Sequence, residues 1–424
     1  MNKKDKTIFD VAVIGGGPAG MMAAITASQN GANVILLEKN KRLGVKLMTT
    51  GGGRCNITNA QNDIKKFAAA FGEGKGFLLS VFSQFNSQDT ISFFEEHGLK
   101  LKVERGERVF PKSDKASSVI KTLTQLLKKN KVVTVTDIDV HRLSVKDKNI
   151  RRIILKNKNT VYAKNIIIAT GGVSYPTTGS TGDGLRWAKG LEHNIANPTP
   201  SLTPLRVEEA WVKELQGLSL KNVELTANLP SKKIKKFGEC LFTHYGLSGP
   251  VPLDMSRGFG EVLLSEKIIL SIDLKPALSY EKLDKRVLKD LSKYSNKKIK
   301  NSLDALLPSK IIPVIIKLSA INPEKKSCEI TKEERARLVK LLKNMNLTVV
   351  GLEGFNNAIV TKGGVCLSEI DQKTMRSKKI SNLFFAGEVI NVDGPTGGFN
   401  LQVCWSTGYI AGKAATKNIS KENE

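Results

Sequence analysis

A glycine-rich segment close to the start of the chain constrains its fold more than any other feature. The apolar run Val11–Ile14 leads into Gly15–Gly20, which reads GGGPAG, and the helical pattern Met21–Asn30 follows. A strand, a tight glycine turn and a helix in this order form the unit in which a pyrophosphate rests on a helix N-terminus. The context is therefore stronger evidence for a nucleotide site than a glycine motif alone.

The residues of this segment have separate predicted tasks. Gly15 makes the turn, Gly17 lets the backbone approach the phosphates, and Gly20 lets the helix pack closely on the strand. A second apolar strand, Asn33–Leu37, ends at Glu38. The carboxylate follows the last glycine at close to the spacing of about 20 residues expected for a group that binds a ribose. The sequence predicts a dinucleotide site.

The composition indicates a folded protein of two or three domains. The chain has 424 residues, of which 40% are hydrophobic, and domains usually contain about 100–200 residues. No apolar run approaches the length of about 18 residues that a membrane span needs, and the first strand begins too early to leave room for a signal peptide. The five cysteines form no CxxC pair. We therefore expect a soluble, cytoplasmic protein without a metal site or disulfides.

The formal net charge of +26 admits two interpretations. A surface for nucleic acid or another polyanion would produce it, and so would lysines spread over solvated helix faces. The lysine runs, such as Lys232–Lys236 and Lys297–Lys300, are scattered, and only 6% of residues are aromatic. This pattern favours solvated lysines and a small-molecule substrate. Because of the net charge, nucleic acid stays an alternative partner.

The strand and helix patterns predict an α/β fold interrupted by an insert. We expect a Rossmann-like domain with a parallel sheet over residues 1–194, an α+β insert over 195–347, and a return to the first domain over 348–424. Three prolines within Asn197–Pro204 mark the crossover. Amphipathic patterns predict one helix over Ser80–Glu96 and another over Lys115–Lys129.

Further glycine loops indicate a long diphosphate ligand. Thr49–Asn56 contains three consecutive glycines, and we expect Lys46 and Arg54 to neutralise a phosphate or a flavin carbonyl. The strand Ile166–Ala169 ends in Thr170-Gly171-Gly172, and Phe384–Ala386 ends in Gly387-Glu388. The Glu388 carboxylate would accept hydrogen bonds from a polyol such as ribityl.

A last glycine turn, Asp393–Asn400, leads into the final helix, whose N-terminus carries a partial positive charge. Directed at the pyrimidine end of a flavin, that charge would stabilise the reduced form. Together the loops fit FAD better than NAD. No second GxGxxG follows a strand, so NAD(P)H as a transient reductant would bind without its own fingerprint, and reductase and oxidase chemistry both stay open.

The chain resembles the HI0933-like, or BaiN-type, NAD(P)/FAD-dependent oxidoreductases, which are two-dinucleotide-binding-domain flavoproteins. The motifs that carry the resemblance are GGGPAG at 15–20, TTGGGRCNITN at 49–59, RVFPKSDKASSV at 108–119, ATGGVSYPTTGSTGDG at 169–184, GECLFTHYGLSGP at 238–250 and FAGEVINVDGPTGGFNLQ at 385–402. The resemblance implies bound FAD in a discontinuous Rossmann-like domain, and an insert that combines a β-barrel with a helical subdomain.

The resemblance also implies a set of FAD contacts. They are Gly15, Gly17, Ala19, Gly20, Glu38, Lys39, Lys46, Gly53, Arg54, Thr170, Gly171, Gly387, Glu388, Asn400 and Leu401, with Val140 in a strand pair near the adenine. The expected activity is hydride transfer through flavin N5 to a substrate that the sequence does not name. The rival interpretation, which the strong basic charge suggests, is a flavoprotein that associates with nucleic acid or modifies RNA.

Two side chains outside this set are candidates for chemistry. His244 lies in a loop rich in turn residues, which we expect to fold over the flavin, and histidine is the side chain that most often acts as a general acid or base. Cys55 lies beside a glycine loop, where a packed thiol is favoured over a redox-active one. We expect His97, His141 and His193 at the surface.

Overall fold

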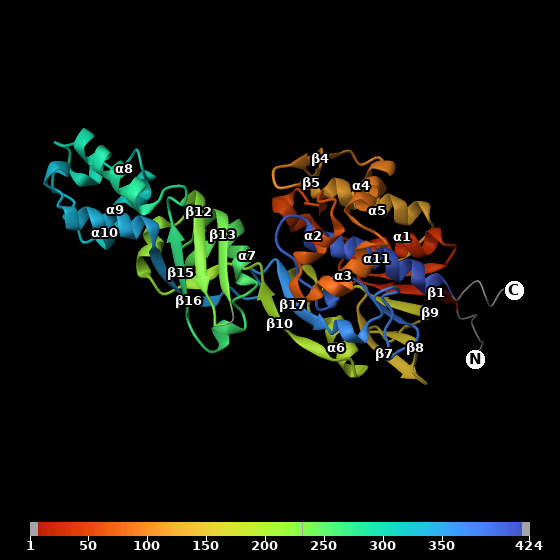
Figure 1. The fold of residues 1–424 in the computed structure, drawn as a ribbon. Helices are drawn as coiled ribbons and strands as arrows, with labels where there is room; N and C mark the ends of the chain where they lie inside the picture. Colours follow the sequence, from red (N-terminus) through yellow and green to blue (C-terminus); the bar gives the residue numbers. More distant parts are fainter. Residues whose placement is uncertain (1–6, 231, 418–424) are drawn as a thin grey trace. The chain divides into compact units, whose positions relative to one another are not determined.

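The computed structural model describes residues 7–230 and 232–417. The chain divides into two compact units, the first formed by residues 1–199 with 358–424 and the second by residues 200–357. The first unit is thus assembled from two separated stretches of sequence, as Figure 1 shows by the meeting of N-terminal and C-terminal colours around one sheet.

The first unit is built on a mostly parallel sheet. Its strand order is β6 (Val133–Val135), β2 (Val34–Leu37), β1 (Ile8–Ile14), β9 (Thr160–Ile168), β8 (Asn149–Leu155) and β7 (Val140–Lys146), and β18 (Leu383–Phe385) also pairs with β9. The pairs β1–β2, β1–β9, β2–β6 and β9–β18 are parallel. The strands β7 and β8 extend the sheet in antiparallel fashion.

Two helices from opposite ends of the sequence lie against each other beside this sheet (Figure 1). They are α1 (Pro18–Gln29) and α11 (Phe399–Thr416). A Cβ added at Gly408 would collide with the carbonyl oxygen of Ala19, and one at Gly412 with that of Ala23. The close approach of these two backbones therefore depends on glycine.

The other elements of the first unit surround this core. The predicted helix over Lys115–Lys129 is confirmed as α5 (Ala116–Lys129). Further helices of this unit are α2 (Ile64–Ala69) and α6 (Asp183–Gly190). A small sheet contains β3 (Thr58–Asn59), β5 (Arg108–Pro111) and β4 (Leu101–Glu104), and β10 (Ile195–Ser201) pairs with β17 (Val360–Val365).

The prediction of one helix over Ser80–Glu96 is wrong. Two helices occupy this stretch, α3 (Lys75–Phe82) and α4 (Ser87–Glu96). The break occurs because Asn86 and Asp89 form a capping box, in which each side chain accepts a hydrogen bond from the other residue's backbone N–H. The apolar periodicity continues across the break and conceals it.

The second unit is a closed antiparallel barrel with attached helices. The barrel order is β11 (Leu205–Val207), β14 (Gly246–Ser248), β13 (Lys233–Phe242), β12 (Ser219–Asn228), β15 (Ile268–Asp273) and β16 (Met345–Leu352). The helices are α7 (Pro250–Ser256), α8 (Tyr280–Lys293), α9 (Ile312–Leu318) and α10 (Lys332–Lys343). The predicted fold class, a Rossmann-like domain with a barrel and helical insert, is confirmed. Within the described ranges, no helix has the length and apolar character needed to cross a membrane.

Replacing Gly408 with Ala tests the α1–α11 contact. We expect Gly408→Ala to lower the free energy of unfolding by about 1–3 kcal/mol, because the added methyl group has no space against Ala19. Gly76 in α3 is the matched control, since a Cβ there meets nothing within 4 Å. Gly76→Ala should be neutral or stabilising. Equal effects of the two changes in urea unfolding would contradict this account of the contact.

Candidate functional site

The parallel pairing brings the carboxyl ends of four strands, β1, β2, β9 and β18, to one edge of the sheet. Ile14, the last residue of β1, is in register with Leu37 of β2 and Ile168 of β9, and Phe385 of β18 is in register with Ile168. The residues that follow these strands are therefore neighbours at that edge. Ligands of open α/β sheets bind at the carboxyl ends of the strands.

The glycines after β1 fall into two physical classes. Gly15 has a φ of +111°, and a Cβ there would collide with the carbonyl oxygen of Ala169; a Cβ at Gly20 would collide with that of Gly15. A Cβ at Gly17, by contrast, meets nothing within 4 Å. Gly15 and Gly20 are thus required by packing, whereas the space in front of Gly17 is open.

The two helices predicted to face the cofactor are among those whose N-termini lack a side-chain cap. Gly17 is the N-cap of α1 and Gly398 is the N-cap of α11, and neither helix has a side-chain cap. Backbone N–H groups in a first helical turn lack intrahelical acceptors. They include those of Ala19 and Gly20 in α1, and of Asn400 and Leu401 in α11. Each helix start is suited to an anion or a partial negative charge.

Glu38 is buried and only partly saturated with hydrogen bonds. Its Oε2 accepts the N–H of Gly16 at 2.6 Å, and its Oε1 accepts the backbone and side-chain N–H groups of Asn40 at 2.8 and 2.7 Å. A carboxylate has about four acceptor positions. The geometry therefore leaves Glu38 the capacity to accept a further hydroxyl group.

Thr170 supplies a buried polar atom that has no partner. Its Oγ1 makes no hydrogen bond within the described residues, and the same is true of Asn56 Oδ1 near the second glycine loop. Gly171 next to Thr170 has a φ of +73°, and a Cβ at Gly184 would collide with Thr170 Oγ1. Buried polar atoms are usually hydrogen-bonded, so these two atoms indicate a missing ligand or water.

Lys46 and Glu388 form a largely buried ion pair. Lys46 Nζ lies 2.7 Å from Glu388 Oε2 and also donates to Ser174 Oγ. Glu388 Oε1 accepts the hydroxyl of Ser174 at 2.8 Å and the N–H of Thr361 at 2.7 Å. Burial disfavours the charged carboxylate, but Lys46 and these hydrogen bonds outweigh it, so the pKa of Glu388 is lowered.

The other two predicted cofactor-binding cations also have protein partners. Lys39 Nζ bonds to Asp183 Oδ2 at 2.7 Å and to Thr181 Oγ1 at 2.6 Å. Arg54 pairs with Glu104 and Asp114, and its guanidinium lies 4.1 Å from the centre of the Phe110 ring. Contact of Lys39, Lys46, Arg54 or Glu388 with a cofactor stays a prediction.

Four further predicted positions have defined surroundings. Asn400 uses its side chain to hold the preceding turn, through Gly394 N–H, Gly394 O and Pro395 O. Gly53 and Gly387 have φ values of +85° and +76°, and Val140 is buried in β7. The Asn400 side chain is thus already engaged within the protein, and the predicted cofactor contact would have to use its backbone N–H.

Cys55 and the histidines need individual assessment. Cys55 is buried, and burial raises the pKa of its thiol to about 12, which favours the packed interpretation over a reactive one. His244 is exposed on the turn between β13 and β14, in the second unit, and its ring meets Tyr245 edge-on. The expectation that His193 lies at the surface is wrong: the ring is buried between Ala188 O and Ser377 Oγ.

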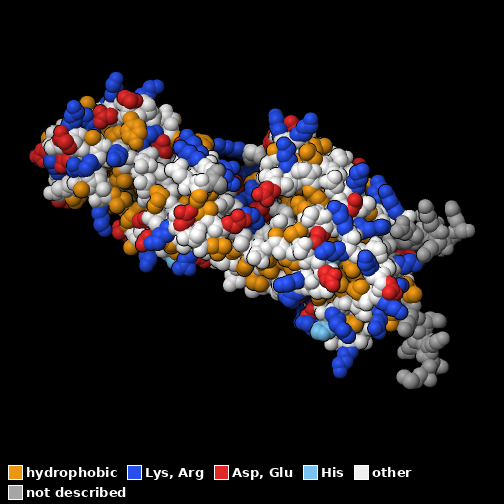
Figure 2. All heavy atoms as spheres, turned by 60° about the horizontal axis from the view of Figure 1, so that its bottom comes forward, with side chains coloured by type: hydrophobic (Ala, Val, Ile, Leu, Met, Phe, Trp, Pro, Cys, Tyr) orange, Lys and Arg blue, Asp and Glu red, His pale blue; other side chains and the backbone are white. Residues whose placement is uncertain are grey.

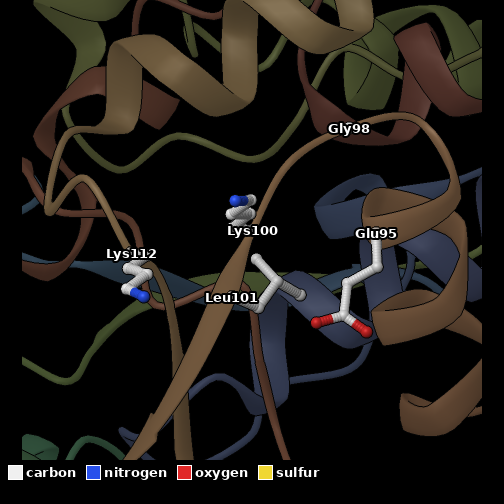
Figure 3. Close-up of a pocket in the computed structure, with 5 residues that line it drawn as sticks. All are labelled: Glu95, Gly98, Lys100, Leu101 and Lys112. Atoms are coloured by element: carbon white, nitrogen blue, oxygen red, sulfur yellow. The ribbon is translucent and has the colours of Figure 1, made fainter.

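A surface pocket lies elsewhere on the first unit. Glu95, Gly98, Lys100, Leu101 and Lys112 line it at the turn between α4 and β4 (Figure 3). None of the predicted cofactor-binding residues belongs to it. Within the described ranges, no group of three or more His, Cys, Asp or Glu side chains has an arrangement suited to a metal ion.

A double-mutant cycle tests the Lys46–Glu388 pair. We expect Lys46→Met and Glu388→Gln each to destabilise the protein by about 3 kcal/mol, because each leaves a buried polar partner uncompensated. The double variant should lose less than the sum, with a coupling of about 0.5–3 kcal/mol. Since the Glu388 pKa is lowered by folding, the advantage of wild type over Glu388→Gln should be full above pH about 4.3 and shrink as the pH falls further.

The exposed pair Lys267–Glu208, with an N–O distance of 3.0 Å, provides the control cycle. Its side chains are 60% and 56% exposed, so its coupling should lie below about 1 kcal/mol. Urea unfolding between pH 3 and pH 7 measures both cycles. Equal couplings would show that the Lys46–Glu388 pair contributes no more than a surface contact.

Known proteins resemble this chain over nearly its whole length. The family model described as HI0933-like protein Rossmann domain matches residues 9–414. The 3-dehydro-bile acid delta(4,6)-reductase of Clostridium scindens is 32% identical over 411 residues, covering 96% of this chain and 99% of that protein. The ribosomal RNA dihydrouridine synthase of Escherichia coli is 30% identical over 404 residues, covering 95% and 96%.

Solved structures share the fold at low sequence identity. The 3-ketosteroid-delta4-(5alpha)-dehydrogenase of Rhodococcus jostii RHA1 aligns with a TM-score of 0.54 and 17% identity, over 98% of both chains. A flavocytochrome c3 fumarate reductase aligns with a TM-score of 0.54 and 18% identity, over 97% of this chain and 79% of that one. With its nearly complete match to the family model, the chain belongs to the HI0933-like family of flavin-dependent oxidoreductases.

Proposed function

We propose that this chain is an FAD-dependent reductase of carbon–carbon double bonds conjugated with a carbonyl group. The observation that carries the cofactor assignment is the open space at Gly17, at the start of a helix without a side-chain cap. The neighbouring Glu38 carboxylate can still accept a hydrogen bond. A pyrophosphate would supply acceptors for the N–H groups at the helix start. An adenosine ribose would supply a hydroxyl group that can donate to Glu38. Thr170 Oγ1, buried without a partner, fits a further contact with the same extended ligand.

In this proposal, residues at two helix starts and after β2 would contact FAD. The N–H groups of Ala19 and Gly20 would bind the pyrophosphate, and Glu38 would bind the ribose. The N–H groups at the start of α11, near Asn400 and Leu401, would face the flavin, where a helix N-terminus favours negative charge. When bound, FAD supplies hydride transfer through N5, and the protein supplies orientation and electrostatics.

The double-bond assignment rests on the chemistry that two relatives share. One is named a bile acid delta(4,6)-reductase and the other an rRNA dihydrouridine synthase. Reduction of a delta(4,6) 3-keto steroid and of a uracil ring both saturate a C=C bond conjugated with a carbonyl. The overall reaction consumes one NAD(P)H and one proton for each bond reduced, with NAD(P)H proposed as the reductant.

RNA is the second candidate substrate, and a specific observation favours it. The formal net charge of +26 suits a polyanionic partner better than a bile acid, which carries little charge. Lys and Arg side chains spread over the face seen in Figure 2, with Asp and Glu between them. A general attraction for phosphates follows from this distribution, and base recognition would need a more local feature.

Replacing Gly17 with Asp tests the cofactor assignment. Because a side chain at this position has free space and Asp is a favoured N-cap, Gly17→Asp should fold with unchanged or higher stability. Its carboxylate would occupy the anion position, so the variant should lose bound FAD. Wild type and the control Gly76→Asp, also in open space, should retain stoichiometric FAD and no FMN. Retention of FAD by Gly17→Asp would contradict the site.

Anaerobic stopped-flow absorbance with NADH and NADPH tests the reductant. We expect one of them to bleach the bound flavin, and a substrate to restore the oxidised spectrum. A delta(4,6) 3-keto steroid and a uridine-containing rRNA transcript are the two substrate probes, with mass spectrometry of the products. Failure of both nicotinamides to reduce the flavin would overturn NAD(P)H as reductant, and failure of both substrates would overturn the double-bond assignment.

His244 is proposed as the general acid or base of the reaction. We expect His244→Ala to retain stoichiometric FAD but to turn over about 10²–10⁴-fold more slowly, the usual contribution of a proton-transferring side chain. His141→Ala, which removes another exposed histidine, should leave turnover unchanged. Normal turnover of His244→Ala together with a lowered melting temperature would make His244 a structural residue.

A further inference from the structure

The barrel exposes one aromatic side chain on the outer side of β13. Phe237 is 59% exposed, whereas Phe242 on the same strand is buried. Its partner across the antiparallel pair is Glu224 of β12, which offers no apolar cover. A single exposed apolar residue is ordinary, so Phe237 gains meaning only from its neighbours.

Those neighbours are a run of four exposed lysines. Lys232, Lys233, Lys235 and Lys236 precede Phe237 directly. Lys235, whose side chain is 56% exposed, pairs with Glu224 at 2.8 Å, and ion pairs near the surface contribute about 0–1 kcal/mol. Lys232, Lys233 and Lys236 form no ion pair among the described residues. Of these lysines, only Lys233 and Lys235 share a face of β13 with Phe237. We name Lys233, Lys235 and Phe237 the Lys-Phe surface.

The strand geometry gives this surface a regular spacing. Alternate residues of a strand share a face, so Lys233, Lys235 and Phe237 point to the same side of β13, about 7 Å apart in sequence order. The opposite face meets α7 at Gly238, where an added Cβ would lie 2.8 Å from Val251 Cγ2. Glu239 is the next residue on the same face as Phe237, and its negative charge marks the end of the basic surface.

We propose that the Lys-Phe surface docks single-stranded RNA, with a base stacked on Phe237 and the lysines on the flanking phosphates. Proteins that bind single strands combine a basic path along the backbone with aromatic side chains on which bases stack. The spacing of the lysines is close to that of successive phosphates in an extended strand. This inference rests on the RNA alternative of the proposed function and adds the surface by which that substrate is held.

Fluorescence anisotropy of a labelled single-stranded uridine oligonucleotide, titrated with the FAD-loaded protein over a range of salt, tests the surface. Phe237→Ala should weaken binding about 5- to 150-fold, the range that one base–aromatic stack gives. Tyr280→Ala, which removes another aromatic residue 48% exposed, is the control. Lys233→Ala/Lys235→Ala should lower the slope of log K against log salt by about 1.4, since each single-strand phosphate contact contributes about 0.7.

The control for the lysine pair is Lys282→Ala/Lys289→Ala on α8, which removes the same charge from exposed positions. All variants should keep the wild-type FAD content and melting temperature, because none of these side chains is buried. If wild type binds RNA but each variant behaves like its control, the surface is wrong and the RNA substrate stands. If Phe237 and the lysines matter for binding but no uracil is reduced, the surface stands and the proposed reaction is wrong.

Two other outcomes would overturn the proposal. One is the absence of a saturable RNA complex for wild type at any salt concentration. The other is loss of binding to vesicles that contain anionic lipid in the Phe237 and lysine variants, with RNA binding unchanged. That pattern would make the Lys-Phe surface a membrane contact.

Discussion

Parallel pairing of β1, β2, β9 and β18 is the constraint on which the candidate site depends. It brings Gly15, Glu38, Thr170 and Gly387 to one edge, although β18 lies more than two hundred residues after β9 in the sequence. The first unit closes only when the C-terminal segment returns to pair with β9 and to place α11 against α1. Cofactor binding should therefore be coupled to the docking of both sequence stretches, because each contributes one uncapped helix start.

Glycine serves two separate purposes at this edge. Gly15, Gly20 and Gly408 are required because neighbouring backbones occupy the space that a side chain would need. This requirement holds whether or not a ligand is bound. Gly17 is different, since its backbone conformation suits any residue and nothing surrounds its missing Cβ. Packing therefore does not explain Gly17, whereas a ligand lying against the helix start does.

Local patterns in the sequence predicted the fold better than they predicted the side-chain contacts. The strand, turn and helix around Gly15–Gly20 were predictable because every residue involved lies within one short segment. The partner of Lys46 was not, since Glu388 is 342 residues away and either charge alone resembles a ligand contact. The burial of His193 depends on Ser377 in the same way. The break before α4 could have been found, because Asn86 and Asp89 have the spacing of a capping box.

The pairing of Lys39, Lys46 and Arg54 with protein carboxylates changes how anion binding should be understood in this chain. A formal charge of +26 suggests that lysines hold the phosphates, yet the three cations predicted to bind the cofactor already pair with carboxylates. In the proposed function, backbone N–H groups of α1 and α11 would then be the main donors to the cofactor, and such contacts depend on backbone geometry more than on side-chain charge. The unpaired lysines lie elsewhere, as at Lys232, Lys233 and Lys236. Salt should therefore weaken polyanion binding while leaving the cofactor in place.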